Sequence, residues 1–250
     1  MDGDSPSAEP TEAFQRAQVN PGIDVFVSKT VTILFLAMLG LILMHALGLV
    51  SRYVYGDDYV FGLVPFFDLD HERNAPSWFA SVLALAGAAL FFLLWRLVPR
   101  ADKPSRAWLF LSLVFVFVSV DEFASIHEEL IVPVRDWLHL SGLFYFAWVV
   151  PYGLCVAILG ISLWPFFRRM EPEVRHRFAA AAVVYLSGAI GMELIGGWVF
   201  ESLAEQRNLT YDLITSVEET LEFVGLILLV RAQLLLLAER VPETRVYLRA

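Results

Sequence analysis

Apolar residues form six long stretches along the chain, separated by short polar segments. The stretches cover residues 30–53, 77–98, 107–130, 142–166, 178–203 and 211–238. Each is long enough to cross a bilayer, because the hydrocarbon core needs about 20 residues of helix. Pro151 in the fourth stretch predicts a kink, which neighbouring helices can accommodate. The pattern therefore predicts an all-α, polytopic membrane protein built as a bundle of six transmembrane helices.

The composition agrees with this interpretation. Of the 250 residues, 58% are hydrophobic and 18% are charged, and the mean hydropathy is +0.62. Soluble domains average nearer 45–50% apolar residues, so the excess indicates a lipid environment, with membrane lipids as neighbours. The single cysteine, Cys155, excludes an intramolecular disulfide and a multi-cysteine metal site. The net charge of −9 comes without a basic stripe, which argues against a nucleic acid partner.

Lysine and arginine are unevenly distributed between the polar segments. Most of them lie at the two ends of the chain and in segments 99–106 and 167–177, whereas the other segments hold only Arg52, Arg73, Arg135 and Arg207. Positively charged loops stay in the cytoplasm, so we expect a multi-pass protein of the cell (inner) membrane with both termini cytoplasmic. The expected organisation is a disordered cytoplasmic tail over residues 1–27, a six-helix transmembrane domain over 28–240 and a cytoplasmic tail over 241–250.

Acidic residues interrupt the apolar stretches, and the predicted topology places them all in the extracytoplasmic half. They are Asp121, Glu122, Glu128, Glu193, Glu218, Glu219 and Glu222, and His45 and His127 fall in the same half. A charge in the middle of a bilayer costs about 2.5–3.5 kcal/mol, and this half offers few basic partners. The charges must therefore be neutralised by protons or by bound cations.

The mixture of carboxylate and imidazole predicts a divalent metal, Zn, Fe or Mn, rather than copper. The best candidate ligands are Glu122, His127, Glu193, Glu219 and Glu222, and further ligands or proton carriers are Asp121, Glu128, Glu218 and His45. On a regular helix His127 does not share a face with Asp121, so a direct joint site requires a helix distortion, a rotated helix end or separate ligand sets.

Two further segments bear on this metal site. Two-iron helical bundles typically contain Glu-x-x-His pairs, and the only such pair here, Glu173 with His176, lies in a predicted cytoplasmic segment, which weakens a di-iron assignment. The acidic segment FFDLDHERN, residues 66–74, is expected to be a solvated loop, with folding over the site as the alternative.

These observations predict an integral membrane metalloprotein with one or two divalent ions in a Glu/Asp/His site. As an enzyme, it would use the metal to activate water or oxygen on a lipid-like or small apolar substrate entering between the helices. The HExxH, GxSxG and Walker signatures are absent from the sequence. Two alternatives stay open: a transporter coupled to protons or cations, with the carboxylates as relay, and an accessory or assembly subunit of a larger membrane complex.

Overall fold

The computed structural model describes residues 21–98 and 105–241, so most of the predicted tails over 1–27 and 241–250 lies outside the described residues. Across these two ranges the chain forms helices and no strand. Six helices are long and apolar enough to cross a membrane: Phe26–Tyr55, Ala75–Leu97, Arg106–Ala124, Val149–Phe167, Pro172–Ser202 and Leu209–Arg240. The prediction of an all-α chain with six such helices is confirmed.

The helical elements follow one another with short connections. They are α2 (Pro21–Val50), α3 (Leu63–Phe66), α4 (Ala75–Leu97), α5 (Ser105–Ala124), α6 (Ile131–Leu138), α7 (Val149–Phe167), α8 (Pro172–Leu186), α9 (Glu193–Ser202) and α10 (Leu209–Arg240). A π-helical turn, Ser51–Tyr55, extends α2, and a second π-helical segment, Ser187–Met192, joins α8 to α9 into one span. Helix α2 already begins by Pro21, ahead of the domain boundary predicted at residue 28.

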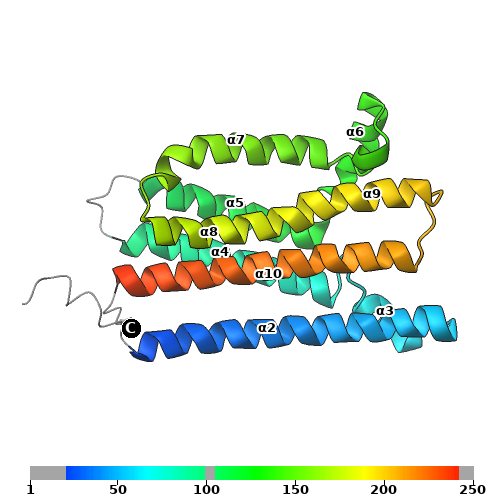
Figure 1. Ribbon diagram of the computed structural model, residues 1–250, viewed down its shortest axis with the longest axis horizontal. Helices are drawn as coiled ribbons and strands as arrows, with labels where there is room; N and C mark the ends of the chain where they lie inside the picture. Colours follow the sequence, from blue (N-terminus) through cyan, green and yellow to red (C-terminus); the bar gives the residue numbers. More distant parts are fainter. Residues whose placement is uncertain (1–20, 99–104, 242–250) are drawn as a thin grey trace, which may run out of the picture.

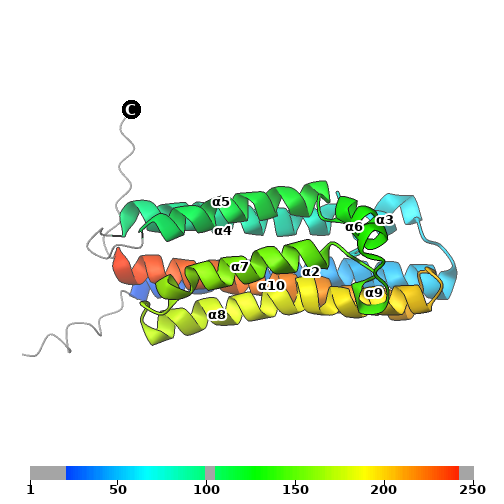
Figure 2. The same cartoon turned by 90° about the horizontal axis from the view of Figure 1, so that it is seen from above.

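The long helices run side by side along the length of the molecule (Figures 1 and 2). The start of α2 and the end of α10 lie at the same end of the bundle; the opposite end, where α2 finishes and α10 begins, is called the distal end below. Helix α10 occupies the middle and packs against α2, α4 and α8, while α5 pairs with α4. That the distal end faces away from the cytoplasm stays a prediction.

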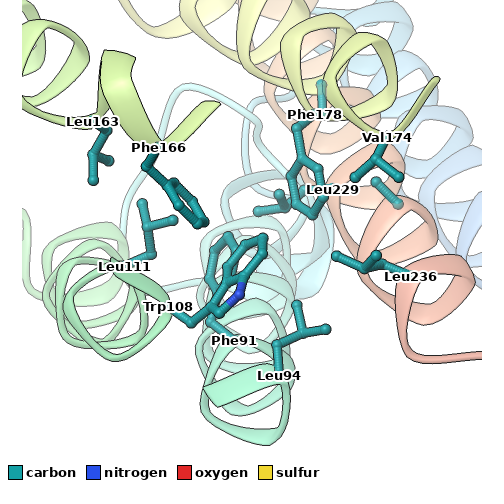
Figure 3. Close-up of a cluster of buried hydrophobic side chains, with 12 residues drawn as sticks. Phe91, Leu94, Trp108, Leu111, Leu163, Phe166, Val174, Phe178, Leu229 and Leu236 are labelled. Atoms are coloured by element: carbon teal, nitrogen blue, oxygen red, sulfur yellow. The ribbon is translucent and has the colours of Figure 1, made fainter. Parts of the chain in front are cut away.

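A cluster of aromatic and aliphatic side chains holds five helices together at the end opposite the distal end. Its labelled members in Figure 3 come from α4, α5, α7, α8 and α10: Phe91, Leu94, Trp108, Leu111, Leu163, Phe166, Val174, Phe178, Leu229 and Leu236. The Trp108 ring stacks on Phe91 at 5.7 Å between centroids and meets Phe166 edge-on at 4.8 Å. Dense apolar packing of this kind fixes the relative positions of the five helices.

Two predicted spans differ from the structure at their ends. The third was expected to run to residue 130, but α5 ends at Ala124, because Ser125 takes a left-handed backbone conformation with φ of 56°. The fourth was expected from residue 142, but α7 begins at Val149, after a short 3₁₀ turn over Gly142–Phe144. Pro151 therefore lies in the first turn of α7, where backbone N–H groups have no acceptor within the helix, and its ring requires no kink there.

The fifth span and α10 approach each other through glycines. A Cβ atom on Gly188 would lie 2.7 Å from the backbone oxygen of Glu218, and one on Gly225 would lie 2.6 Å from the Cα atom of Tyr185. Only a glycine permits such a close approach on each of the two helices. The contact sets the distance between α10 and the π-helical segment, and both of these elements line the site described below.

Replacing Gly225 with alanine is expected to destabilise the protein by about 1–3 kcal/mol, because the backbone of Tyr185 cannot yield as a flexible side chain would. The measurement is the thermal unfolding midpoint in mild detergent. Gly40→Ala in α2 is the matched control, since a Cβ there meets nothing within 4 Å. Equal midpoints for the two variants would contradict the prediction.

Candidate metal centre

A cavity of about 200 Å³ lies at the distal end of the bundle, between α5, α7, the fifth span and α10. Among the described residues, nine carboxylates line it: Asp70, Glu72, Asp121, Glu122, Glu128, Glu193, Glu218, Glu219 and Glu222. His127 lines it too, and no lysine or arginine of the described chain does. The cavity therefore gathers a large excess of acidic groups in one place.

The structure brings nearly all the predicted site residues together. The five predicted ligands, Glu122, His127, Glu193, Glu219 and Glu222, all line the cavity. So do three of the four further candidates, Asp121, Glu128 and Glu218. These residues come from α5, the link after α5, α9 and α10, which are far apart in the sequence but share this cavity.

His45 is the candidate that lies away from the cavity lining. Its Nε2 atom is 2.9 Å from the Ser216 hydroxyl, whose own proton is donated to the backbone oxygen of Asp212. Its Nδ1 atom accepts a hydrogen bond of 3.1 Å from the backbone N–H of Leu69. Both ring nitrogens are thus engaged, with the proton on Nε2. His45 joins α2, α10 and the loop over residues 67–74, and offers no free nitrogen to a metal.

The break after α5 supplies the distortion that a joint site of Asp121 and His127 requires. Beyond Ser125 the chain turns back, so that the His127 backbone N–H donates to Asp121 Oδ1 at 3.0 Å, and ring Nδ1 lies 3.2 Å from Oδ2. Burial opposes a charge on the ring, but the hydrogen bond and the nearby acidic groups outweigh it and raise the pKa of His127 to about 9. Asp121 orients the ring, and Nε2 can ligate a metal only after it releases its proton.

Sequence reasoning missed two site residues, Asp70 and Glu72, which belong to the loop over residues 67–74. The loop lies over the cavity, as the alternative interpretation of FFDLDHERN required, and both carboxylates line it. Burial, helped by the charge of Glu122, raises the pKa of Glu72 to about 8. The available signal was the acidity of the segment just before the second span, at the end where the other acids gather.

Glu72 meets two predicted site residues at the mouth of the cavity. Glu72, His127 and Glu128 each offer a ligand atom, and the three atoms lie within 4.8 Å of one another. Glu72 Oε2 is buried and has no hydrogen-bond partner in the described chain. These three residues, Glu72 of the loop with His127 and Glu128 of the link after α5, therefore form a set of donors suited to a small cation.

Two arginines fix the loop in this position, and we call their network the arginine clamp. The buried carboxylate of Asp68 accepts from Arg52 Nη2 at 2.7 Å and from Arg207 Nη2 at 2.8 Å. Asp212, also buried, accepts from Arg52 Nη1 at 2.9 Å and from Arg207 Nε. Although burial alone would raise it, these arginines keep the pKa of Asp68 below its ordinary value. The clamp joins the end of α2, the loop and the start of α10.

Aromatic donors orient several of the cavity carboxylates. The pairs are Tyr152 Oη to Asp121 Oδ1 at 3.0 Å, Tyr185 Oη to Glu122 Oε1 at 2.9 Å, Tyr211 Oη to Asp70 Oδ1 at 3.1 Å and Trp148 Nε1 to Glu193 Oε1 at 2.6 Å. Carboxylates that ligate metals are commonly held by such outer hydrogen bonds. Each donor is more than 30 residues away in the sequence from the carboxylate that it holds, so sequence spacing could not reveal these pairs.

Comparison with known proteins identifies a family and no characterised relative. A family model described as a domain of unknown function, DUF8692, matches residues 33–237, which is most of the chain. No curated protein and no solved structure matches the sequence.

Proposed function

Since the chain belongs to this family of unknown function, we propose its activity from the cavity itself: it is an integral membrane metalloprotein that binds a divalent cation at the distal end. The observation that carries this proposal is the lining of the cavity. Nine carboxylates and one histidine converge there, and no lysine or arginine among the described residues accompanies them. Ionised carboxylates cannot be left unpaired inside a membrane protein, and a divalent cation is the partner that this donor set suits best.

Glu72, His127 and Glu128 are the proposed ligands nearest one another, because their donor atoms already lie within 4.8 Å. The ligand types favour Zn, Fe or Mn. The Asp121 carboxylate lies at hydrogen-bond distance from the Nδ1 atom of His127. A carboxylate behind the ring is common among metal-binding histidines. The same cavity is also lined by four acids of the candidate membrane spans: Glu122, Glu193, Glu219 and Glu222.

A metal held in this way would supply activation of water or dioxygen. We propose a lipid-like or small apolar substrate, because apolar side chains also line the cavity. They include Val118 of α5, Val156 of α7, and Leu186 and Ile190 of the fifth span. These four residues belong to segments that are apolar enough to lie within a membrane.

The test of the proposed function is to determine the metal content of protein purified in mild detergent without chelator. We expect at least one equivalent of Zn, Fe or Mn per chain in the wild-type protein and a clear decrease in a Glu193→Gln/Glu222→Gln double variant. Glutamine keeps the size of each side chain but removes the charge that binds the cation. The matched control is Glu171→Gln/Glu239→Gln, which changes two exposed glutamates in ion pairs with Arg240 and Arg177.

The measured metal contents separate the three functional hypotheses. Metal loss confined to the cavity variant supports the metalloprotein, and the identity of the metal separates redox from hydrolytic chemistry. Wild-type protein that stays metal-free after addition of Zn²⁺, Fe²⁺ or Mn²⁺ contradicts the proposal. Proton-dependent transport in proteoliposomes would then favour a transporter, and copurification of a stable membrane partner would favour an assembly subunit.

A further inference from the structure

We infer that the cavity holds two metal ions in separate ligand sets, an inference that rests on the proposed function and extends it. The first set, called the loop set, is Glu72, His127 and Glu128. The second, called the helix set, consists of carboxylates on the membrane-spanning helices: Glu122, Glu193, Glu218, Glu219 and Glu222.

The two sets come from different parts of the fold. Every member of the loop set lies outside the six spans, on the loop over residues 67–74 or in the link after α5. Every member of the helix set lies within a span. The loop set has its three donor atoms within 4.8 Å of one another, without any contribution from the helix set. It is therefore complete enough to hold one ion by itself.

The burial of the Glu218 carboxylate is the observation that calls for a second ion. Its side chain is 7% exposed, and it lines the cavity. Its Oε2 atom is fully buried and accepts no hydrogen bond from an N–H or hydroxyl group of the described chain, and its nearest charged neighbour is another carboxyl group, that of Glu193. A buried carboxylate oxygen without a hydrogen-bond donor carries a large desolvation cost, which a bound cation would remove.

Neighbouring features point the same way. Glu222 is 8% exposed and lies one turn along α10 from Glu218, on the face that the Gly188 contact brings against the fifth span. The hydrogen bonds that Trp148 donates to Glu193 and Tyr185 donates to Glu122 hold two more members in place. These donors supply no positive charge, so the helix set keeps its acidic excess after they are counted.

A single divalent ion in the loop set would leave this excess in the membrane-spanning region. Two ions side by side in one carboxylate cavity are a common arrangement in metalloenzymes, in which each ion keeps some ligands of its own. The helix set offers the second ion oxygen donors only, whereas the loop set adds an imidazole. The helix-set ion is therefore expected to be the harder metal of the two, with Mn²⁺ a better occupant than Zn²⁺.

The test is titration with Mn²⁺ of protein in detergent, cleared of metal beforehand, with bound ions counted by electron paramagnetic resonance. We expect about two Mn²⁺ per wild-type chain and about one in each double variant. The loop-set variant is Glu72→Gln/Glu128→Gln, and the helix-set variant is Glu218→Gln/Glu222→Gln. Size-exclusion profiles and thermal unfolding report whether each variant is folded, and the single variant Glu218→Gln replaces the second double variant if that one is unfolded.

The possible counts distinguish this inference from the proposed function. One ion in the wild-type protein that is lost in both folded variants means a single shared site, which overturns the inference and leaves the proposed function standing. Loss of both ions in either folded variant also overturns it, because separate ligand sets should fail separately. No bound ion in the wild-type protein contradicts the inference and the proposed function together.

Discussion

Replacement of Arg207 by glutamine is expected to destabilise the protein by about 3–5 kcal/mol and to weaken metal binding. Arg207 bonds to Asp68, Asp70 and Asp212, and two of these carboxylates, those of Asp68 and Asp212, are almost completely buried. Removing one partner from a buried ion network leaves uncompensated charge, which costs far more than the loss of an exposed ion pair. Of the two arginines in the clamp, only Arg52 would then face the two buried carboxylates.

The effect on metal binding follows from the position of the clamp. Arg207 is not a cavity-lining residue, but it holds the loop that carries Glu72 over the cavity. The measurements are the thermal unfolding midpoint and a Mn²⁺ titration of the same preparation. We expect a lower midpoint together with a weaker apparent affinity for the ion held by the loop set.

Arg177→Gln is the matched control, because it removes an arginine that also bridges two carboxylates. Its partners, Glu173 and Glu239, are 77% and 42% exposed at the side chain, and such surface pairs contribute about 0–1 kcal/mol. The midpoint should therefore change little, and the titration should not change. Equal destabilisation by the two substitutions would show that the clamp is no stronger than a surface ion pair.

Changing Asp121 to asparagine is expected to weaken metal binding by about 10–100-fold with little change in the number of ions bound at saturation. This is the effect typical of removing the carboxylate behind a metal-binding histidine. Asp121 accepts from the backbone of His127 and lies 3.2 Å from ring Nδ1, so it fixes both the position and the tautomer of the ring. Asparagine keeps the size of the side chain but removes its charge.

The affinity is measured by Mn²⁺ titration, with Asp58→Asn as the control. Asp58 is exposed and lies at the distal end, but it does not line the cavity. The control variant should therefore bind the ions as the wild-type protein does. Unchanged affinity in the Asp121 variant would mean that His127 is not a ligand, whereas complete loss of one ion would make Asp121 a ligand itself.

Much of the architecture follows from the sequence alone, because a bilayer permits few solutions. Apolar stretches of membrane-spanning length must become helices, since the backbone finds no other hydrogen-bond partners in lipid. The number of spans and the choice of residues such as Glu193 and Glu222 as cavity acids therefore required no tertiary information. The energetic cost of a carboxylate in a membrane span was enough to single them out.

Helix ends were harder to predict, because local backbone geometry decides them. The third apolar stretch was predicted to continue past Ala124. Nothing in the pattern of apolar and polar residues required Ser125 to adopt a left-handed backbone conformation. That single residue ends α5 and turns His127 back onto Asp121. An argument from periodicity assumes a regular helix, and on a regular helix Asp121 and His127 lie on different faces. The fold nevertheless brings these two side chains into contact.

The sequence by itself thus determined an all-α chain with six helices long and apolar enough to span a membrane, and it predicted most of the acids that line one cavity. Only the tertiary structure decided that Glu72 and Asp70 join them, that His45 does not, and that Arg52 and Arg207 hold the loop over the cavity. The physical reason is that the free-energy cost of placing a carboxylate in a membrane span applies to each residue separately. It can therefore be judged from a single sequence. Contacts between side chains distant in the chain depend on how the helices pack, which no local pattern records.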